Sequence, residues 1–192
     1  ASGEIAVFPV VETQQENEVC RRVIAPADIT PEVAAEVEAI ARTLLTGLNN
    51  VIGIFGIELF LTADDKLLVN EIAPRTHNSG HFTLDACETS QFEQHLRAVC
   101  GLPLGSTALK SSGAVMVNLL GYEFAEDDYL AQRQQIAKIK NADLWWYGKT
   151  EARPGRKLGH VTVLLDGEDA SLLKEEAGAI AQTIETLWHS KK

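Results

Sequence analysis

Two apolar segments joined by a short polar turn constrain the fold of this chain most strongly. The first spans residues 52–62, the second spans residues 66–72, and one alanine and two aspartates separate them. Apolar runs rich in β-branched and aromatic residues, bounded by turn residues, are typical of strands that pair in an antiparallel hairpin. Each segment contains a single acidic residue, Glu58 in the first and Glu71 in the second. The pattern therefore predicts a hairpin with one carboxylate on each strand.

The expected pairing brings these two carboxylates face to face. If the turn is centred between the two aspartates, Thr62 pairs with Leu67 and Glu58 pairs with Glu71. Opposed residues lie on one face with Cβ atoms about 4.5–5.5 Å apart, and carboxylates that close repel unless they share a proton or bind a cation. Mg²⁺ binds carboxylates together with substrate phosphates. Two alternatives stay open: a one-residue slip would put the acids on opposite faces, or one acid could pair with Arg75.

The loop after the second strand, residues 73–81, is rich in groups that bind anions and polar substrates. Arginine suits planar recognition of phosphate, carboxylate or bicarbonate. Its two histidines, four residues apart, would suit zinc on a helix, but Pro74 and Gly80 favour a loop. An ordinary polar loop is the alternative. The polar side chains of this loop include Arg75, His77, Asn78, Ser79 and His81.

A cluster of basic residues stands out because the whole chain is acidic. The formal net charge is −10 at pH 7, which disfavours general binding to nucleic acid or to an anionic membrane. Four cations nevertheless lie within nine residues, where Gly148, Pro154 and Gly155 indicate a loop. This loop is a candidate site for an anion, most simply a phosphate monoester, with a solvated turn as the alternative. The four cations are Lys149, Arg153, Arg156 and Lys157.

Composition and patterning predict an α+β protein of one large or two small domains. The 192 residues are 45% hydrophobic, and the three cysteines are too few and too scattered for a disulfide framework. A small polar segment at residues 104–112 suggests a boundary, which divides the chain into domains 1–104 and 105–192. Thr30 and Pro31 form a helix-start signal. Strands are expected at 5–11, 20–24, 114–120, 144–147 and 160–165, and helices at 31–47, 90–101, 127–139 and 170–188.

Several separated motifs closely resemble one enzyme family. They are GIELF at 56–60, VNEIAPRTHNSGH at 69–81, TSQFEQH at 89–95, GLPLG at 101–105, YGK at 147–149 and RKLGH at 156–160. The family is the ATP-grasp carboxylases of purine biosynthesis, the N5-carboxyaminoimidazole ribonucleotide synthetases, also known as the ATPase subunit of phosphoribosylaminoimidazole carboxylase. The resemblance runs nearly the whole length of the chain.

The resemblance implies a fold of class α+β, the C-terminal half of an ATP-grasp fold followed by a small α/β C-terminal domain. Members of the family are about twice as long as this chain and begin with a nucleotide-like domain and the lobe that binds adenine. The first residues lack an initiator Met and lead directly into strand-like sequence. We therefore expect a fragment that does not turn over alone.

The resemblance also implies a role for each motif residue. Glu58 and Glu71 correspond to the magnesium ligands that bind the ATP phosphates, and Asn70 lies with them at the nucleotide. Arg75 would face the transferred phosphoryl group or bicarbonate, as a catalytic residue together with His77. The substrate-binding residues implied for the aminoimidazole ribonucleotide are His77 and Asn78 at the base, and Lys149, Arg156, Arg153 and Lys157 at the 5′-phosphate.

The chemistry implied by the resemblance is ATP-dependent carboxylation. Bicarbonate and ATP give carboxyphosphate, which carboxylates the exocyclic amine of 5-aminoimidazole ribonucleotide. The expected cofactors are ATP and Mg²⁺, for which Mn²⁺ can substitute. The full-length enzyme is expected to be a cytoplasmic homodimer, and no nucleic-acid or membrane partner is expected. Two positions depart from the family pattern: Ala73 replaces an asparagine common in ATP-grasp enzymes, and Trp145 replaces a common histidine. Another ATP-grasp ligase and a non-catalytic binding or assembly module are the alternatives.

Overall fold

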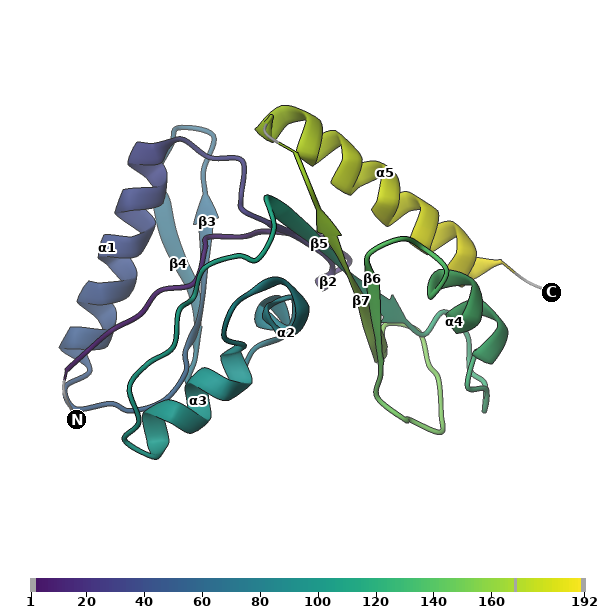
Figure 1. The fold of residues 1–192 in the computed structure, drawn as a ribbon, viewed down its shortest axis with the longest axis horizontal. Coiled ribbons are helices and arrows are strands. Elements are labelled where there is room, and N and C mark those ends of the chain that lie inside the picture. The colour runs from purple at the N-terminus through teal and green to yellow at the C-terminus, as the bar shows by residue number, and fades with distance from the viewer. Residues whose placement is uncertain (1–2, 168, 191–192) are drawn as a thin grey trace. The chain divides into compact units, whose positions relative to one another are not determined.

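The protein is described by a computed structural model that covers residues 3–167 and 169–190 and divides into two compact units (Figure 1). Unit 1 comprises residues 1–10 and 29–110, and unit 2 comprises residues 11–28 and 111–192. The predicted domain boundary after residue 104 lies six residues before the point at which the chain passes from unit 1 to unit 2, after residue 110. The expected domains also differ from these units because residues 11–28, expected in the first domain, belong to unit 2.

Unit 1 is a two-stranded hairpin accompanied by helices (Figure 1). Thr30 caps its first helix by accepting a 3.3 Å hydrogen bond from the Val33 N–H, and Ser90 caps another by accepting one of 3.1 Å from the Glu93 N–H. Both caps confirm start signals in the sequence. Its elements are α1 (Pro31–Gly47), β3 (Gly56–Leu61), β4 (Leu67–Ala73), the 3₁₀ turn η1 (Asn78–Gly80), α2 (Thr83–Ala86) and α3 (Gln91–Val99).

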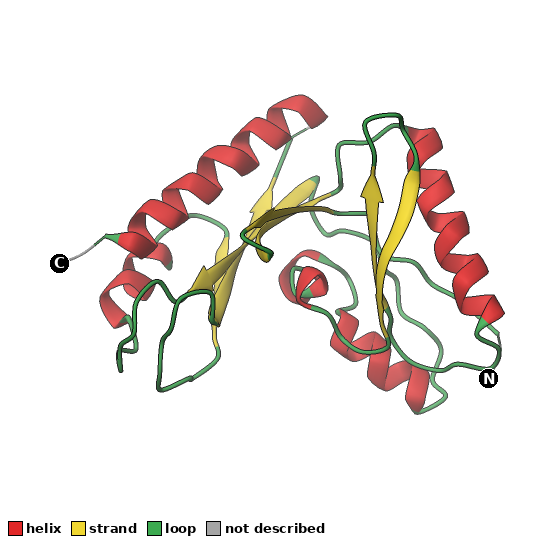
Figure 2. Cartoon of the chain, turned by 180° about the vertical axis from the view of Figure 1, so that it is seen from behind, coloured by secondary structure: helices red, strands yellow, loops and turns green. Residues whose placement is uncertain are grey.

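Unit 2 is a five-stranded sheet in the order β1-β2-β5-β7-β6, with two helices. Every described ladder in it is antiparallel. The long helix α5 lies along the sheet (Figure 2), and its apolar stripe joins the core through Ala177, Ile184 and Trp188. The elements are β1 (Glu12–Glu16), β2 (Val19–Ala25), β5 (Gly113–Leu120), α4 (Leu130–Ile136), β6 (Ala142–Trp146), β7 (Lys157–Leu165) and α5 (Ala170–His189).

The strand expected at residues 5–11 is wrong. The first strand is the more polar segment β1, which pairs with β2, whereas the carbonyls of Ile5 and Val7 accept hydrogen bonds from side chains. A strand needs a partner with free backbone groups, so local β propensity is overridden here. The helix expected from residue 127 begins only at Leu130, because Tyr129 adopts a left-handed φ of 51°.

None of the described helices is both long and apolar enough to cross a lipid bilayer.

Candidate functional site

The hairpin of unit 1 places Glu58 opposite Glu71, as the sequence predicts. The register beside the turn is nevertheless one residue away from the expected one, since Leu61 rather than Thr62 faces Leu67. A bulge corrects this offset: Leu59 pairs with Val69 while Glu58 pairs with Glu71, so Asn70 is the extra residue of β4. Without the bulge, the slip would have put the two acids on opposite faces. The bulge is therefore what assembles the carboxylate pair.

The bulge also brings a neutral polar side chain to the pair. The Asn70 amide Nδ2 donates a 3.4 Å hydrogen bond to Glu58 Oε2. On the other side, His77 Nε2 lies 3.7 Å from Glu58 Oε1. The Glu58 side chain keeps 20% of its surface exposed, and Glu71 is exposed. Asn70, Glu71, Glu58 and His77 thus form one polar group that a ligand can reach from solvent.

The donor set of this group fits magnesium. Two carboxylates offer the hard oxygen ligands that Mg²⁺ prefers, and the ion usually completes its shell with substrate phosphates and water. Across residues 3–167 and 169–190, no cluster of three or more His, Cys, Asp or Glu side chains forms a metal site from protein ligands alone. Ala73, at the position where many ATP-grasp enzymes have asparagine, is buried with 3% exposure and offers no side-chain ligand.

The loop that follows the second acid is fixed by one buried glutamine. The Gln91 carbonyl Oε1 accepts a 2.9 Å hydrogen bond from the His77 N–H, and its amide Nε2 lies 2.8 Å from both the His77 carbonyl and His81 Nδ1. A methyl group on Gly80 would come within 2.6 Å of the Gln91 oxygen. The contact between loop and helix α3 is therefore close as well as hydrogen-bonded, which fixes the backbone that carries His77.

The remaining predicted residues of this loop lie around the same turn. Arg75 is exposed, and its Nη1 donates a 3.1 Å hydrogen bond to the Thr76 carbonyl. Asn78 opens the 3₁₀ turn η1, which His77 caps at its start. His77 Nδ1 lies 2.9 Å from Ser79 Oγ. Because the His77 and His81 rings are each engaged by loop or helix partners, the structure gives no support to a zinc pair.

The basic cluster of unit 2 lies on the loop between β6 and β7, as expected. The ammonium of Lys149 donates a 2.5 Å hydrogen bond to the Lys157 carbonyl, and Arg156 Nη1 donates one of 2.9 Å to the Glu151 carbonyl. Burial lowers the Lys149 pKa from its ordinary value, and the charges of Arg156, Lys157 and Arg153 lower it further. These cations therefore lie close enough to repel one another, which keeps the loop a candidate site for a phosphate dianion.

The aromatic residues before this loop differ in burial, since Trp146 and Tyr147 are half-buried whereas Trp145 is 44% exposed. The Tyr147 hydroxyl lies 2.8 Å from His160 Nδ1, and burial raises the Tyr147 pKa to about 12. Trp145, which stands where the family commonly has histidine, stacks on His160 with an interplanar angle of 14° and a centroid distance of 6.4 Å. His160 itself is buried. Trp145 thus covers His160 on one side and faces solvent on the other.

Sequence reasoning missed Gln91 and Gly121, which hydrogen-bond to the backbone of the two loops. Gln91 stands directly after the helix-capping serine, where its side chain has no distinctive pattern of spacing. Gly121 follows β5 and supports the basic loop through the backbone. Such roles depend on contacts with residues distant in the chain, so local patterns do not indicate them.

Two known family domains match the sequence. Residues 1–92 match the ATP-grasp domain, and residues 114–174 match the C-terminal domain of phosphoribosylaminoimidazole carboxylase. The first match contains the carboxylate pair and the loop after it, and the second contains the basic loop.

Three curated bacterial relatives share one name, N5-carboxyaminoimidazole ribonucleotide synthase. The N5-carboxyaminoimidazole ribonucleotide synthase of Synechococcus elongatus is 56% identical over 97% of this chain and 47% of its own length. That of Bacillus subtilis is 47% identical over 88% of this chain and 42% of its own length. The chain thus spans about half the length of the curated relatives it matches.

Solved structures give the same result for the fold. An N5-carboxyaminoimidazole ribonucleotide synthetase in its ADP complex superposes with a TM-score of 0.83 at 42% identity, covering 97% of this chain and 46% of that one. A synthase from Aspergillus clavatus, in complex with ADP and 5-aminoimidazole ribonucleotide, superposes with a TM-score of 0.83 at 34% identity, covering 95% of this chain and 48% of that one.

Proposed function

The chain belongs to the N5-carboxyaminoimidazole ribonucleotide synthetase family of ATP-grasp enzymes, and from that premise we propose that it supplies the metal-binding and ribonucleotide-phosphate-binding parts of such a synthetase. The full reaction converts 5-aminoimidazole ribonucleotide, bicarbonate and ATP to N5-carboxyaminoimidazole ribonucleotide, ADP and phosphate. The observation that carries the proposal is the opposed pair Glu58 and Glu71, which a bulge assembles beside His77. A solved relative binds ADP and 5-aminoimidazole ribonucleotide together.

The hairpin serves the phosphate end of ATP. Glu58 and Glu71 present two carboxylates on one face, and Asn70 orients one of them through its amide. Mg²⁺, or Mn²⁺ in its place, supplies charge neutralisation at the phosphates when it is bound. Carboxylates fixed in place lower the free-energy barrier to phosphoryl transfer, because the site does not have to reorganise as charge develops in the transition state.

The loop after the hairpin serves the transfer itself. A bicarbonate oxygen attacks the γ-phosphorus, the bond to ADP breaks, and carboxyphosphate forms. The exocyclic amine of the ribonucleotide then attacks the carboxyl carbon as phosphate leaves and the amine loses a proton. Arg75 is placed to neutralise the transferred phosphoryl group or bicarbonate. His77 and Asn78 offer hydrogen bonds to the ribonucleotide, and Gln91 fixes the backbone that carries His77.

The basic loop of unit 2 serves the 5′-phosphate of the ribonucleotide. Lys149 and Arg156 are the principal ligands in this proposal, with Arg153 and Lys157 beside them. Burial and then the charges of the neighbouring cations lower the pKa of Lys149, and the repulsion among the cations is relieved when a dianion binds. As in the family, we expect the complete protein to be a cytoplasmic homodimer.

ADP release tests the proposal directly. The purified chain is incubated with Mg-ATP, bicarbonate and 5-aminoimidazole ribonucleotide, with and without the N-terminal half of a related synthetase. Release that needs both the added half and bicarbonate supports the proposal. A chain that releases ADP alone contradicts its role as one part of the site, and release with formate or an amino acid in place of bicarbonate indicates a different ATP-grasp ligase.

Two variants link that activity to the carboxylate pair. Glu58→Gln removes a carboxylate charge from the pair, whereas Asp65→Asn removes one from the exposed turn of the same hairpin. The reconstituted rate is expected to fall about 100-fold or more in Glu58→Gln and to stay unchanged in Asp65→Asn. Equal rates in both variants would contradict the assignment of the pair.

A further inference from the structure

A backbone strap attaches the basic loop to the rest of unit 2. The strap is residues 121–125, which leave the end of β5. The Gly121 N–H donates a 2.8 Å hydrogen bond to the Arg156 carbonyl, and the Gly155 N–H donates one of 2.9 Å to the Gly121 carbonyl. At the other end of the strap, Ala125 and Ala152 exchange two hydrogen bonds of 2.8 and 3.3 Å. The strap therefore contacts the loop through main chain at two separate points.

Gly121 sits where the strap and the loop come closest. A Cβ atom at this position would lie 2.4 Å from the Arg153 carbonyl oxygen and 3.0 Å from its nitrogen. Both atoms are backbone, so no side-chain rotation relieves such a clash. Gly121 is also buried. Any larger residue there must push the segment that carries Arg153 and Arg156 away from its present course.

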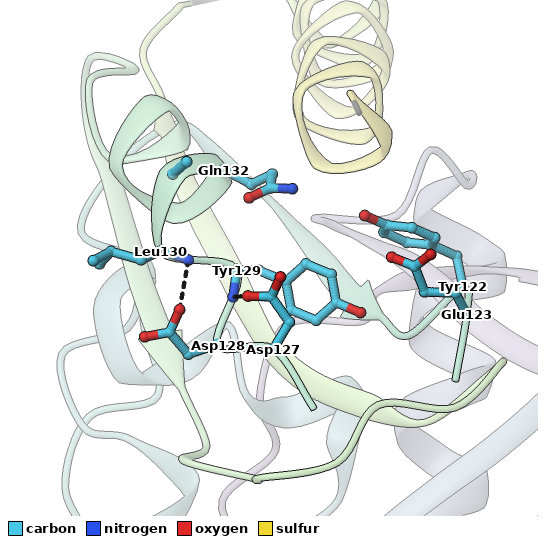
Figure 3. Close-up of a pocket in the computed structure, with 8 residues that line it drawn as sticks. Tyr122, Glu123, Asp127, Asp128, Tyr129, Leu130 and Gln132 are labelled. Carbon is cyan, nitrogen blue, oxygen red and sulfur yellow. Dashed lines mark hydrogen bonds between the residues drawn. The ribbon is translucent and has the colours of Figure 1, made fainter. Parts of the chain in front are cut away.

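The strap is itself firmly attached on its far side. Tyr122 packs edge-on against Tyr129 and Trp188, with centroid distances of 5.7 and 6.3 Å. Beyond the strap, Asp127 and Asp128 accept hydrogen bonds of 2.7 and 3.0 Å from the backbone N–H groups two residues further on, which fixes the turn into α4 (Figure 3). Tyr122 and Ala125 therefore hold the strap against the core of unit 2.

A firm support matters because the loop collects like charges. Lys149, Arg153, Arg156 and Lys157 repel one another, and only part of that charge is offset locally, for example by Glu151 at 3.7 Å from Arg156. A flexible loop would relax by spreading its cations apart. It would then pay an ordering cost to collect them again around an anion.

We propose that Gly121 is a positioning residue: through the strap it fixes the basic loop in the shape that receives a phosphate monoester dianion before the ligand arrives. The inference rests on the proposed function of this loop. It extends that function because the affinity of the loop for a phosphate monoester then depends on Gly121, a residue that has no side chain and does not touch the phosphate.

Titration calorimetry of the purified chain with ribose 5-phosphate tests the inference. Gly121→Ala is expected to weaken binding about tenfold or more, since small displacements of a preorganised site are costly. Gly178→Ala is the matched control, because a methyl group at Gly178 on helix α5 meets nothing within 4 Å, and it is expected to bind as the parent does. Equal affinities for the parent and Gly121→Ala overturn the inference alone. A parent chain that does not bind ribose 5-phosphate overturns both the inference and the proposed role of the loop.

A second readout separates positioning from general damage to the fold. Nuclear magnetic resonance of the lysine side chains follows the Lys149 pKa, which burial and neighbouring cations lower in the parent. If Gly121→Ala lets the loop spread, that pKa moves up toward its ordinary value of 10.5, while Gly178→Ala leaves it unchanged. If Gly121→Ala does not fold, Ala125→Pro removes one N–H of the bridge to Ala152 and is expected to weaken binding and raise the Lys149 pKa in the same way. An unchanged Lys149 pKa and affinity in a folded strap variant overturn the inference.

Discussion

Units 1 and 2 are stabilised by different kinds of buried side chain. Unit 2 contains a continuous apolar core in which Trp188, Ile184 and Val161 are almost fully buried. In unit 1, Phe82 is the one large apolar side chain that is buried among the described residues, and the buried set also includes polar side chains. Those polar side chains are Thr83, Thr89, Gln91 and Gln94.

The two buried glutamines of α3 act in the same way on two different loops. Gln91 donates to and accepts from the backbone of His77, with distances of 2.8 and 2.9 Å. Gln94 does the same with Gly105, at 2.6 and 2.9 Å. Unit 1 thus fixes these two loops by paired side-chain amide hydrogen bonds, whereas unit 2 holds its basic loop by backbone hydrogen bonds and is stabilised by its apolar core. Apolar side chains such as Phe60, 56% exposed, and Leu96, 61% exposed, remain at the surface of unit 1.

The largest effect is expected from a cavity in the core of unit 2. Ile184→Ala removes a fully buried side chain and should lower the free energy of unfolding by about 2–5 kcal/mol. In unit 1, Leu96→Ala removes a similar but exposed side chain and should change stability by no more than about 0.5 kcal/mol. Urea unfolding followed by tryptophan fluorescence measures unit 2, because all three tryptophans lie there, and hydrogen exchange of the α3 amides measures unit 1. Similar losses in both variants would show that the contrast between the units is false.

An intermediate effect is expected from the polar clamp of unit 1, by which we mean the two hydrogen bonds between the Gln91 side chain and the His77 backbone. Gln91→Ala leaves the His77 N–H and carbonyl without their partner, which should cost about 1–3 kcal/mol. Hydrogen exchange at the His77 amide should accelerate, while the tryptophan transition of unit 2 stays in place. The exposed Gln134 on α4 provides the control substitution Gln134→Ala. Unchanged exchange at His77 in Gln91→Ala would break the distinction between the clamp and the core.

The smallest effect is expected from the titration of Lys149. Its pKa in the folded chain is lowered by burial and by neighbouring cations. Between that value and 10.5, the ordinary pKa, the unfolded chain binds more protons, so the stability of unit 2 should rise with pH in this window. Urea unfolding over that window should show the rise in the parent chain and not in Lys149→Gln. A parent whose stability falls through the window would contradict the crowding of cations on this loop.

Much of the site could be predicted because its chemistry is local. The carboxylate pair follows from two lone acids in apolar strands, and the basic loop follows from four cations between turn residues. The pairing of Glu58 with Glu71 is confirmed, although the register at the turn is wrong. The pairing beside the turn is shifted by one residue from the expected register, since Leu61 pairs with Leu67. The bulge at Asn70 shifts it back by one residue, so the two shifts cancel. A bulge depends on the twist of both strands together, so single-strand patterns do not indicate it.

The parts that the sequence did not predict depend on distant contacts. Residues 5–11 have the composition of a strand, but their carbonyls bind Arg42 and Thr107 instead of a neighbouring strand. The polar segment β1 becomes a strand because β2 offers it a ladder. Gln91 and Gly121 matter through what lies against them, which only the folded structure defines.

Paramagnetic broadening by Mn²⁺ tests the central claim most directly, that Glu58 and Glu71 form one metal site. In nuclear magnetic resonance spectra of the purified chain, added Mn²⁺ should broaden signals around Glu58, Asn70 and Glu71 first. The broadening should be lost in Glu58→Gln and retained in Asp65→Asn, which removes the same charge from the hairpin turn. Broadening centred elsewhere, or unchanged by Glu58→Gln, would contradict the assignment of this pair as the metal ligands.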